Sequence, residues 1–335
     1  MCVAAVLLAL VLLMERVRMI ESQHIPSVAI PVAIAPTTQL YGGEVAEEHT
    51  GAVGAGAMGA GERDELFRSI VSKTKSDKVN EHHYDRMYGQ FLIPLLADLH
   101  RPPSKRPVKL LEIGLGCDSR YGPGESILIW QQLLNTNDSL WMAEVNASCA
   151  NTFRNHPRLK NVQVLAGDQG NVSILQSWIR LSDARASPYD VIIDDGSHEN
   201  PGIFLTFKAL WDVLRWGGVY FIEDLQVNRH PAWNPPPLKI GGTLTNLGSY
   251  VNDTVANNTA AAAGPSGAQL PNPNPSPIVP VMLDILADWN EQLICLKSRQ
   301  RSKRKWPLPE GVASISCFRH ACVIVKCARR DNSCL

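Results

Sequence analysis

Two short apolar runs that end in acidic residues constrain this sequence more than any other feature. Residues 189–194 read Tyr-Asp-Val-Ile-Ile-Asp and lead into Asp195, and residues 219–222 read Val-Tyr-Phe-Ile and lead into Glu223 and Asp224. A β-branched and aromatic run of this length is typical of a strand that is buried in a parallel sheet. Ligands of open α/β sheets collect at the carboxyl ends of such strands. We therefore expect these acids to face one site.

The acids predict a metal site with a histidine beside it. Three ionised carboxylates that lie close together need a counter-charge, and a hard divalent cation is the usual one. We therefore predict that Asp195, Glu223 and Asp224 bind a divalent cation. His198 follows three residues after Asp195 and is the candidate catalytic residue, a general base that acts on what the cation holds. Two alternatives remain: the acids cap the following helices, or the histidine caps a helix or hydrogen-bonds Asp195.

A glycine turn earlier in the chain predicts a nucleotide-like ligand. Residues 108–113 are predicted to form a strand, and Gly114 and Gly116 follow it, where glycines let the backbone approach a ligand. The acid Glu112 lies inside this strand, and Glu144 ends the next predicted strand, where a carboxylate can bind ribose hydroxyls. Ser119 replaces the third glycine of the dinucleotide pattern, which argues against an NAD-dependent oxidoreductase.

Strands that alternate with helices predict a doubly wound α/β domain. The sheet is expected to be mostly parallel and seven-stranded, with a C-terminal antiparallel hairpin that inserts one reversed strand. The predicted strands are residues 108–113, 140–144, 162–166, 189–194, 219–224, 312–318 and 322–326. The predicted helices are residues 126–134, 174–181, 203–214 and 278–296, with two more before the sheet, and the Trp-Gly-Gly at 216–218 is expected to end the third.

The chain outside this domain divides by composition. Residues 1–20 form an apolar segment, read as a signal peptide, an anchor or an incorrectly chosen start, and residues 21–61 read as a flexible linker. Residues 62–335 are the predicted catalytic domain. It contains a Pro- and Ala-rich insertion at 228–277, expected to be partly disordered, with residues 225–233 near the site. Membrane association through the first segment and homo-oligomer formation are both open.

The charge and the cysteines of the sequence give expectations about the binding partners of the protein and its cellular compartment. The 32 basic residues balance the 32 acidic ones, so no nucleic-acid partner is expected. Eight cysteines include a late group without the Cys-x-x-Cys spacing of a zinc site. We expect Cys317, Cys322 and Cys327 to be buried thiols, and the alternative is a disulfide, which would require an oxidising compartment. Asn171 is one of five glycosylation sequons and falls in the expected cofactor pocket. A cytoplasmic or membrane-associated location is therefore expected, with the secretory pathway as the alternative.

The motifs resemble a known enzyme family. The stretch Leu-Glu-Ile-Gly-Leu-Gly at 111–116 looks like the first motif of class I S-adenosylmethionine-dependent methyltransferases. Residues 167–169, 194–198 and 222–226 resemble the macrocin and mycinamicin type of sugar O-methyltransferase more specifically, and the Ser-Asp-Lys at 76–78 resembles that family's entry motif. The resemblance covers about residues 77–226 and implies a Rossmann-like methyltransferase fold.

The resemblance also implies cofactors and roles. S-adenosylmethionine and Mg²⁺ are the implied cofactors, with Asp195, Glu223 and Asp224 as metal ligands and His198 as base. The implied cofactor-binding residues are Glu112, Gly114, Gly116, Glu144, Asp168, Gln169 and Asp194. The implied substrate is a small molecule with a hydroxyl group, sugar-like or another vicinal diol, which includes glycosides. A macrolide is not expected, since the insertion is unrelated in composition. The alternative function is a binding protein of the same fold that has lost turnover.

Overall fold

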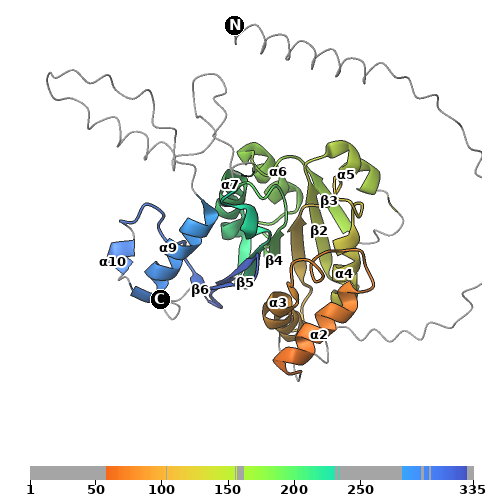
Figure 1. The fold of residues 1–335 in the computed structure, drawn as a ribbon, viewed down its shortest axis with the longest axis horizontal. Coiled ribbons are helices and arrows are strands. Elements are labelled where there is room, and N and C mark those ends of the chain that lie inside the picture. The colour runs from red at the N-terminus through yellow and green to blue at the C-terminus, as the bar shows by residue number, and fades with distance from the viewer. Residues whose placement is uncertain are drawn as a thin grey trace, which may run out of the picture. The chain divides into compact units, whose positions relative to one another are not determined.

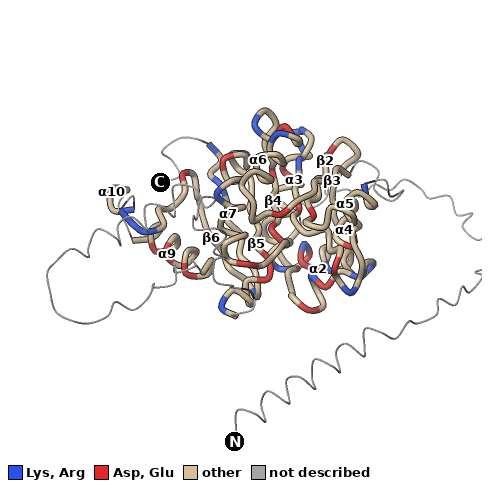
Figure 2. Tube along the Cα trace, turned by 90° about the horizontal axis from the view of Figure 1, so that it is seen from above, with Lys and Arg blue, Asp and Glu red and all other residues tan. Residues whose placement is uncertain are grey.

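The computed structural model describes residues 58–102, 104–154, 156, 162–230, 233, 281–295, 298–301 and 303–329. The apolar segment 1–20, nearly all of the linker and most of the insertion lie outside these residues, so their predicted character stays a prediction. Among the helices that are described, none combines the length and apolar character that a membrane span requires. Figure 2 shows Lys and Arg interspersed with Asp and Glu along the described chain.

The described residues form one seven-stranded sheet, whose strands lie in the order β3-β2-β1-β4-β5-β7-β6. The first five strands are parallel, and β7 runs antiparallel to both β5 and β6. The strands are β1 (Lys109–Ile113), β2 (Ser139–Glu144), β3 (Val162–Ala166), β4 (Tyr189–Asp194), β5 (Leu214–Ile222), β6 (Val312–Cys317) and β7 (Cys322–Lys326). The predicted doubly wound sheet with one inserted reversed strand is confirmed.

Helices cover both faces of the sheet (Figure 1). Alternate strand residues face opposite layers, so that Leu110 packs into one apolar cluster and Leu111 into the other. The first cluster includes residues of α2 (Ala60–Val71), α3 (Asp85–His100), α4 (Glu125–Leu133) and α5 (Ala147–Arg154). The second includes residues of α6 (Val172–Leu181), α7 (Asn200–Leu210) and α9 (Met282–Cys295). A short α10 (Ser298–Arg301) follows α9.

Helix α5, helix α7 and strand β5 differ from the prediction. Helix α5 was not predicted, because it buries only Ala150 and therefore shows little apolar periodicity. The predicted helix 203–214 ends earlier, since α7 stops at Leu210 and a short 3₁₀ turn, η2 (Trp211–Val213), follows. Strand β5 then begins at Leu214 and contains Gly217, which has a φ of 83°. The glycines thus form an irregularity inside a strand and do not end a helix.

The prediction that Cys317, Cys322 and Cys327 are buried thiols is wrong, and the disulfide alternative is the one that the structure shows. Cys317 pairs with Cys322 in a disulfide, and Cys117 pairs with Cys149 in a second. Cys327 is also disulfide-bonded, and of the described cysteines only Cys295 is free. The first bond follows from the hairpin, whose register places residues 317 and 322 opposite each other. The second bond joins the turn after β1 to α5. The closeness of Cys117 and Cys149 could not be predicted, because α5 itself was not predicted.

We predict that the bond between Cys117 and Cys149 stabilises the domain. It closes a sequence separation of 32 residues, and its removal by Cys117→Ser with Cys149→Ser should lower the free energy of unfolding by about 2–4 kcal/mol. Urea unfolding under non-reducing conditions measures this difference. Cys295→Ser removes an exposed free thiol and is the matched control, expected to be near neutral. Equal unfolding midpoints for the wild type and both variants would contradict a stabilising role of this disulfide.

Candidate functional site

The carboxyl ends of β1, β4 and β5 meet at one edge of the sheet. Their backbones stay paired just beyond the strands, since the amide of Asp195 donates to the Ile113 carbonyl and the amide of Glu223 to the Asp194 carbonyl, both at 3.0 Å. The side chains differ in exposure: Asp195 is 26% exposed and Asp224 20%, whereas Glu223 is 1% exposed. Two of the three predicted metal ligands therefore open onto the site, and the third is buried.

Asp195, His198 and Asp224 form the open cluster. One potential ligand atom of each lies within 4.8 Å of the others, and His198 Nε2 is 3.5 Å from Asp224 Oδ2. Both His198 and Asp224 have a φ of 55°, a left-handed conformation that is uncommon outside glycine and often marks a functional site. The ring of Trp233 lies 5.8 Å from that of His198, so the start of the insertion reaches the site as predicted.

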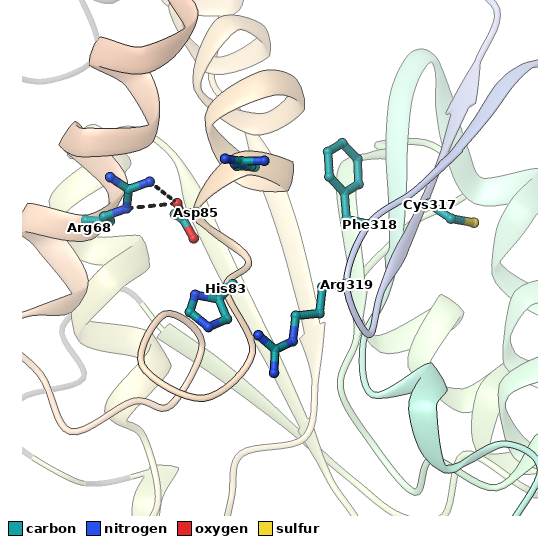
Figure 3. Close-up of a pocket in the computed structure, with 7 residues that line it drawn as sticks. Arg68, His83, Asp85, Cys317, Phe318 and Arg319 are labelled. Atoms are coloured by element: carbon teal, nitrogen blue, oxygen red, sulfur yellow. Dashed lines mark hydrogen bonds and ion pairs between the residues drawn. The ribbon is translucent and has the colours of Figure 1, made fainter.

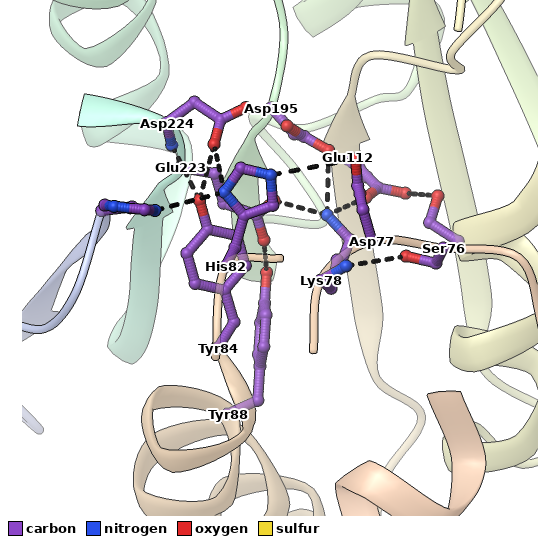
Figure 4. A network of polar contacts seen from close by, with 12 residues as sticks. Ser76, Asp77, Lys78, His82, Tyr84, Tyr88, Glu112, Asp195, Glu223 and Asp224 are labelled. Carbon is purple, nitrogen blue, oxygen red and sulfur yellow. Dashed lines mark hydrogen bonds and ion pairs between the residues drawn. The ribbon is translucent and has the colours of Figure 1, made fainter. Parts of the chain in front are cut away.

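Glu223 belongs to a second, buried group. Lys78 Nζ lies 2.5 Å from Glu223 Oε2, 2.9 Å from Asp195 Oδ2 and 3.3 Å from Glu112 Oε1 (Figure 4). The Tyr88 hydroxyl donates to the other oxygen of Glu223. Glu223 is therefore buried beside the open cluster and shares Lys78 with Asp195, and its role as a third metal ligand stays a prediction.

The charge state of Lys78 follows from its neighbours. Burial alone would lower the pKa of its ammonium, but Asp195, Glu223 and Glu112 raise that pKa well above the usual value. Burial also raises the pKa of Glu223, which by itself would favour its protonated form. The contact of 2.5 Å to Lys78 stabilises the carboxylate, and we take the pair as ionised.

The loop between α2 and α3 holds Asp224 from the other side. The Tyr84 hydroxyl donates to Asp224 Oδ1 at 2.8 Å and accepts from the Asp224 amide at 3.0 Å, and His82 Nδ1 lies 3.1 Å from Oδ1. Burial would raise the pKa of Asp224, but His198, His82 and the Tyr84 hydroxyl outweigh it and lower that pKa. His320, at the turn between β6 and β7, lies 3.4 Å from His82.

Sequence reasoning missed these supporting residues. Two signals pointed to this loop: residues 76–84 are unusually polar for a connector, and the Ser-Asp-Lys at 76–78 resembles the family's entry motif. Neither signal gave the individual roles of Lys78, His82 and Tyr84. Tyr88 in α3 and His320 in the turn between β6 and β7 had no comparable signal in the sequence.

The glycine turn is required by packing. Gly114 has a φ of 102°, and a side chain there would place its Cβ 2.0 Å from the carbonyl oxygen of Asp195. Gly116 has a φ of 78°. Close approach of the turns after β1 and β4 therefore needs glycine at position 114. Glu144 at the end of β2 is buried, with one oxygen accepting from the Asn146 amide at 2.8 Å.

Three predicted cofactor-binding side chains are engaged inside the protein. Gln169 donates to Asp194 at 2.9 Å and accepts from the Ser197 amide at 2.8 Å. Glu112 accepts from Ser126 at 2.6 Å and from Trp130 at 2.7 Å. These side chains hold the strand ends in place, and their contact with a cofactor stays a prediction.

The two remaining polar positions of this edge are exposed. Asp168 accepts from the Gly170 amide at 2.7 Å, and it stays available to a ligand. The Asn171 side chain caps α6 by accepting from the Ser173 amide. The side chain is exposed, and the location expected from it stays a prediction.

A separate hollow lies between the start of α3 and the turn after β6 (Figure 3). Its lining contains none of the predicted site residues, and its Arg68 is already paired with Asp85 at 2.5 Å. The hollow is lined by Arg68, His83, Asp85, Arg86, Cys317, Phe318 and Arg319. The chemistry that the sequence predicted lies at the strand ends and outside this hollow.

The known proteins to which this chain is similar include several O-methyltransferases. No family model matches the chain. It is 30% identical over 159 residues to 8-demethyl-8-alpha-L-rhamnosyl tetracenomycin-C 2'-O-methyltransferase of Streptomyces olivaceus, covering 47% of this chain and 37% of that protein. It is 28% identical over 168 residues to demethylmacrocin O-methyltransferase of Streptomyces fradiae, covering 50% and 36%. Mycinamicin VI 2''-O-methyltransferase of Micromonospora griseorubida is 27% identical over 177 residues, covering 52% and 38%.

These relatives confirm the resemblance to macrocin- and mycinamicin-type sugar O-methyltransferases. The matched part spans less than two-fifths of each of the three relatives. Among solved structures, the methyltransferase MycE of the mycinamycin biosynthetic pathway, in complex with Mg and SAH, matches with a TM-score of 0.50 and 17% identity. The match covers 79% of this chain and 55% of that one, and it supports the methyltransferase-like fold.

We predict that Asp194 makes stability depend on pH. Burial raises its pKa from 3.8 to about 6, so the folded protein holds this proton more tightly than the unfolded chain. The stabilisation is fully present below about pH 4 and is lost as the pH rises through about 6. As the pH rises between these limits, the wild type should lose about 3 kcal/mol of its free energy of unfolding. Asp194→Asn has no carboxyl group at this position and should not show this loss. Urea unfolding in EDTA at several pH values measures the free energy of unfolding of both proteins. If it depends on pH in the same way for the wild type and for Asp194→Asn, the prediction is contradicted. Asp98→Asn, at an exposed position of α3, is the control.

Proposed function

We propose that this chain is an S-adenosylmethionine-dependent O-methyltransferase that acts on a hydroxyl of a sugar-like or other vicinal-diol small molecule. The observation that carries the proposal is the open cluster of Asp195, His198 and Asp224 beside the glycine turn of β1. This edge of an open α/β sheet is where ligands bind. The relatives support the proposal, since their names describe O-methyltransferases and the first is named for a rhamnosyl substrate.

The cofactor would lie across the ends of β1 and β2. Asn146 fixes one oxygen of Glu144 at 2.8 Å, which orients the carboxylate and leaves its second oxygen for the ribose hydroxyls. The turn at Gly114 and Gly116 brings backbone close to the same place. The solved structure of MycE contains SAH, which supports S-adenosylmethionine as the cofactor of this chain.

The open cluster fits a magnesium ion. Mg²⁺ is usually held by one or two carboxylates together with water and substrate oxygens, and Asp195 and Asp224 supply two partly exposed carboxylates. We assign these two as residues that would hold the ion, and Glu223, buried beside them, stays the predicted third ligand. When bound, the ion polarises the acceptor hydroxyl and fixes a vicinal diol in place.

His198 is the proposed general base. Methyl transfer breaks the bond from carbon to sulfur as the bond from carbon to the acceptor oxygen forms, and the hydroxyl proton must leave that oxygen. His198 Nε2 faces Asp224, whose carboxylate stabilises the imidazolium, so Nδ1 is the proposed proton acceptor. The ring contact with Trp233 limits the motion of the imidazole.

We predict that the chain binds S-adenosylhomocysteine through Glu144. Glu144→Ala removes charge-assisted hydrogen bonds to the ribose and should weaken binding by about 1.5–3 kcal/mol. Isothermal titration calorimetry of the full chain measures the affinity. Asp98→Ala removes an exposed acid of α3 and should leave the affinity unchanged. Undiminished affinity in Glu144→Ala would refute the assigned cofactor site.

We predict that methyl transfer requires His198 and a divalent cation. His198→Ala should retain cofactor binding but lose about 10²–10⁴-fold in rate, the usual contribution of a positioned base. EDTA should abolish turnover and spare cofactor affinity. The assay follows S-adenosylhomocysteine release with a panel of rhamnosides and other glycosides, each paired with its deoxy analogue that lacks the diol. Release without acceptor is the background control. Absence of turnover with every diol tested would favour the alternative of a binding protein that has lost catalysis. Full activity in EDTA would refute the requirement for a divalent cation.

A further inference from the structure

The disulfide between Cys117 and Cys149 lies beside the proposed cofactor site. Cys117 directly follows Gly116, and Cys149 lies near the start of α5, the helix that follows Glu144. The bond therefore joins the glycine turn after β1 to the helix after β2. These are the two strand ends to which the proposed function assigns the cofactor. Both cysteines are partly exposed, so the bond is accessible to thiol reagents.

Asn146 connects the proposed ribose-binding carboxylate to the start of α5. Its amide donates to Glu144 Oε1 at 2.8 Å, and its side-chain oxygen accepts from the Cys149 amide at 3.1 Å. Its carbonyl accepts from the Ala150 amide at 2.9 Å. The orientation of the Glu144 carboxylate is thus coupled to the position of the helical turn that carries Cys149.

On the other side of the bond, residues 117–124 form an extended loop between the glycine turn and α4. The Gly124 amide donates to the Leu115 carbonyl at 2.9 Å, which closes the loop on itself. At this end Gly124 packs against Phe153 of α5, so closely that a Cβ there would lie 2.7 Å from a ring carbon. The loop therefore contacts α5 at both of its ends, through an apolar contact at one and a covalent bond at the other.

Resting on the proposed function, we propose that Cys117 and Cys149 are positioning residues of the cofactor site. Their disulfide holds the glycine turn and the end of β2 in the arrangement in which both contact S-adenosylmethionine. A link that fixes a site in its bound arrangement raises affinity, because the cost of ordering the site is no longer part of binding. Without the bond only a fraction of the molecules has this arrangement, and the apparent affinity falls by that fraction.

The second disulfide provides a matched control within the same chain. Cys317 and Cys322 close the hairpin of β6 and β7. In the sheet, β7 is separated from β1 by β4 and β5, so this bond lies away from the strand ends that the cofactor would contact. Its removal also deletes one covalent bond, but it leaves the link between the glycine turn and α5 intact.

Calorimetry of the full chain with S-adenosylhomocysteine tests the proposal. Cys117→Ser with Cys149→Ser should weaken binding about tenfold or more, because the site must be ordered on binding. Cys317→Ser with Cys322→Ser should stay within about twofold of the wild type, since distant sites act independently. Circular dichroism establishes that each variant is folded.

Two outcomes of this titration overturn the proposal. In one, the variant without the bond between Cys117 and Cys149 keeps the affinity of the wild type. In the other, the control variant weakens binding equally, since a general loss of stability would then account for both results.

A reciprocal measurement uses the wild type and needs no variant to fold. If the bond favours cofactor binding, bound S-adenosylhomocysteine must favour the bond by the same factor. In a glutathione buffer, two reduced glutathione molecules become one oxidised glutathione as the disulfide gives two thiols. Saturating S-adenosylhomocysteine should therefore shift this equilibrium for Cys117 and Cys149 toward the disulfide by about tenfold. The equilibrium for Cys317 and Cys322 should not change.

Alkylation of free thiols after an acid quench, read by peptide mass spectrometry, measures both equilibria. An equal shift of the two disulfides, or no shift of either, would overturn the positioning role. The result is also separable from the proposed function. Equal affinity of the oxidised and the reduced chain for S-adenosylhomocysteine would refute the positioning role alone, whereas an oxidised wild type without affinity would refute the cofactor and this proposal with it.

Discussion

The two-residue period of the strands determines which acids of this protein meet. Glu112 shares its face of β1 with Leu110, and both lie toward the layer of α2, α3 and α4. The same alternation, continued one residue past β4 and β5, directs Asp195 and Glu223 to that layer, where Lys78 contacts all three. Asp194 has the opposite parity and meets Gln169 and Tyr220 on the other face. A single geometric rule thus separates acids that are neighbours in sequence.

Asp224 departs from this rule. Its left-handed backbone ends the extended run and turns the side chain toward His198 and His82. The loop that carries Lys78 also carries His82 and Tyr84, so one segment before the sheet contacts both the buried and the open carboxylates. The site is therefore built by three strand ends and one preceding loop, and its buried half is closed by side chains from α3 and its loop.

The strands could be predicted from sequence because each is a buried run with its own local pattern. The edge of the sheet that carries the site followed from the acids at the ends of two such runs. Side-chain partners had no comparable local signal: Lys78 and Glu223 are 145 residues apart, and one lysine in a polar loop shows no periodicity. Helix α5 was missed because a single buried alanine shows no apolar face, and the start of β5 because glycines more often end an element.

The disulfides bear on where such a chain can mature. Cys117–Cys149 joins the turn after β1 to α5, and Cys317–Cys322 closes the hairpin whose inner strand pairs with β5. Bonds of this kind form through oxidant-driven thiol exchange and persist in secretory or other oxidising compartments, whereas cytosolic glutathione and thioredoxin keep thiols reduced. Formation of these two bonds therefore requires an oxidant. Recombinant production of the oxidised chain would require an oxidising host.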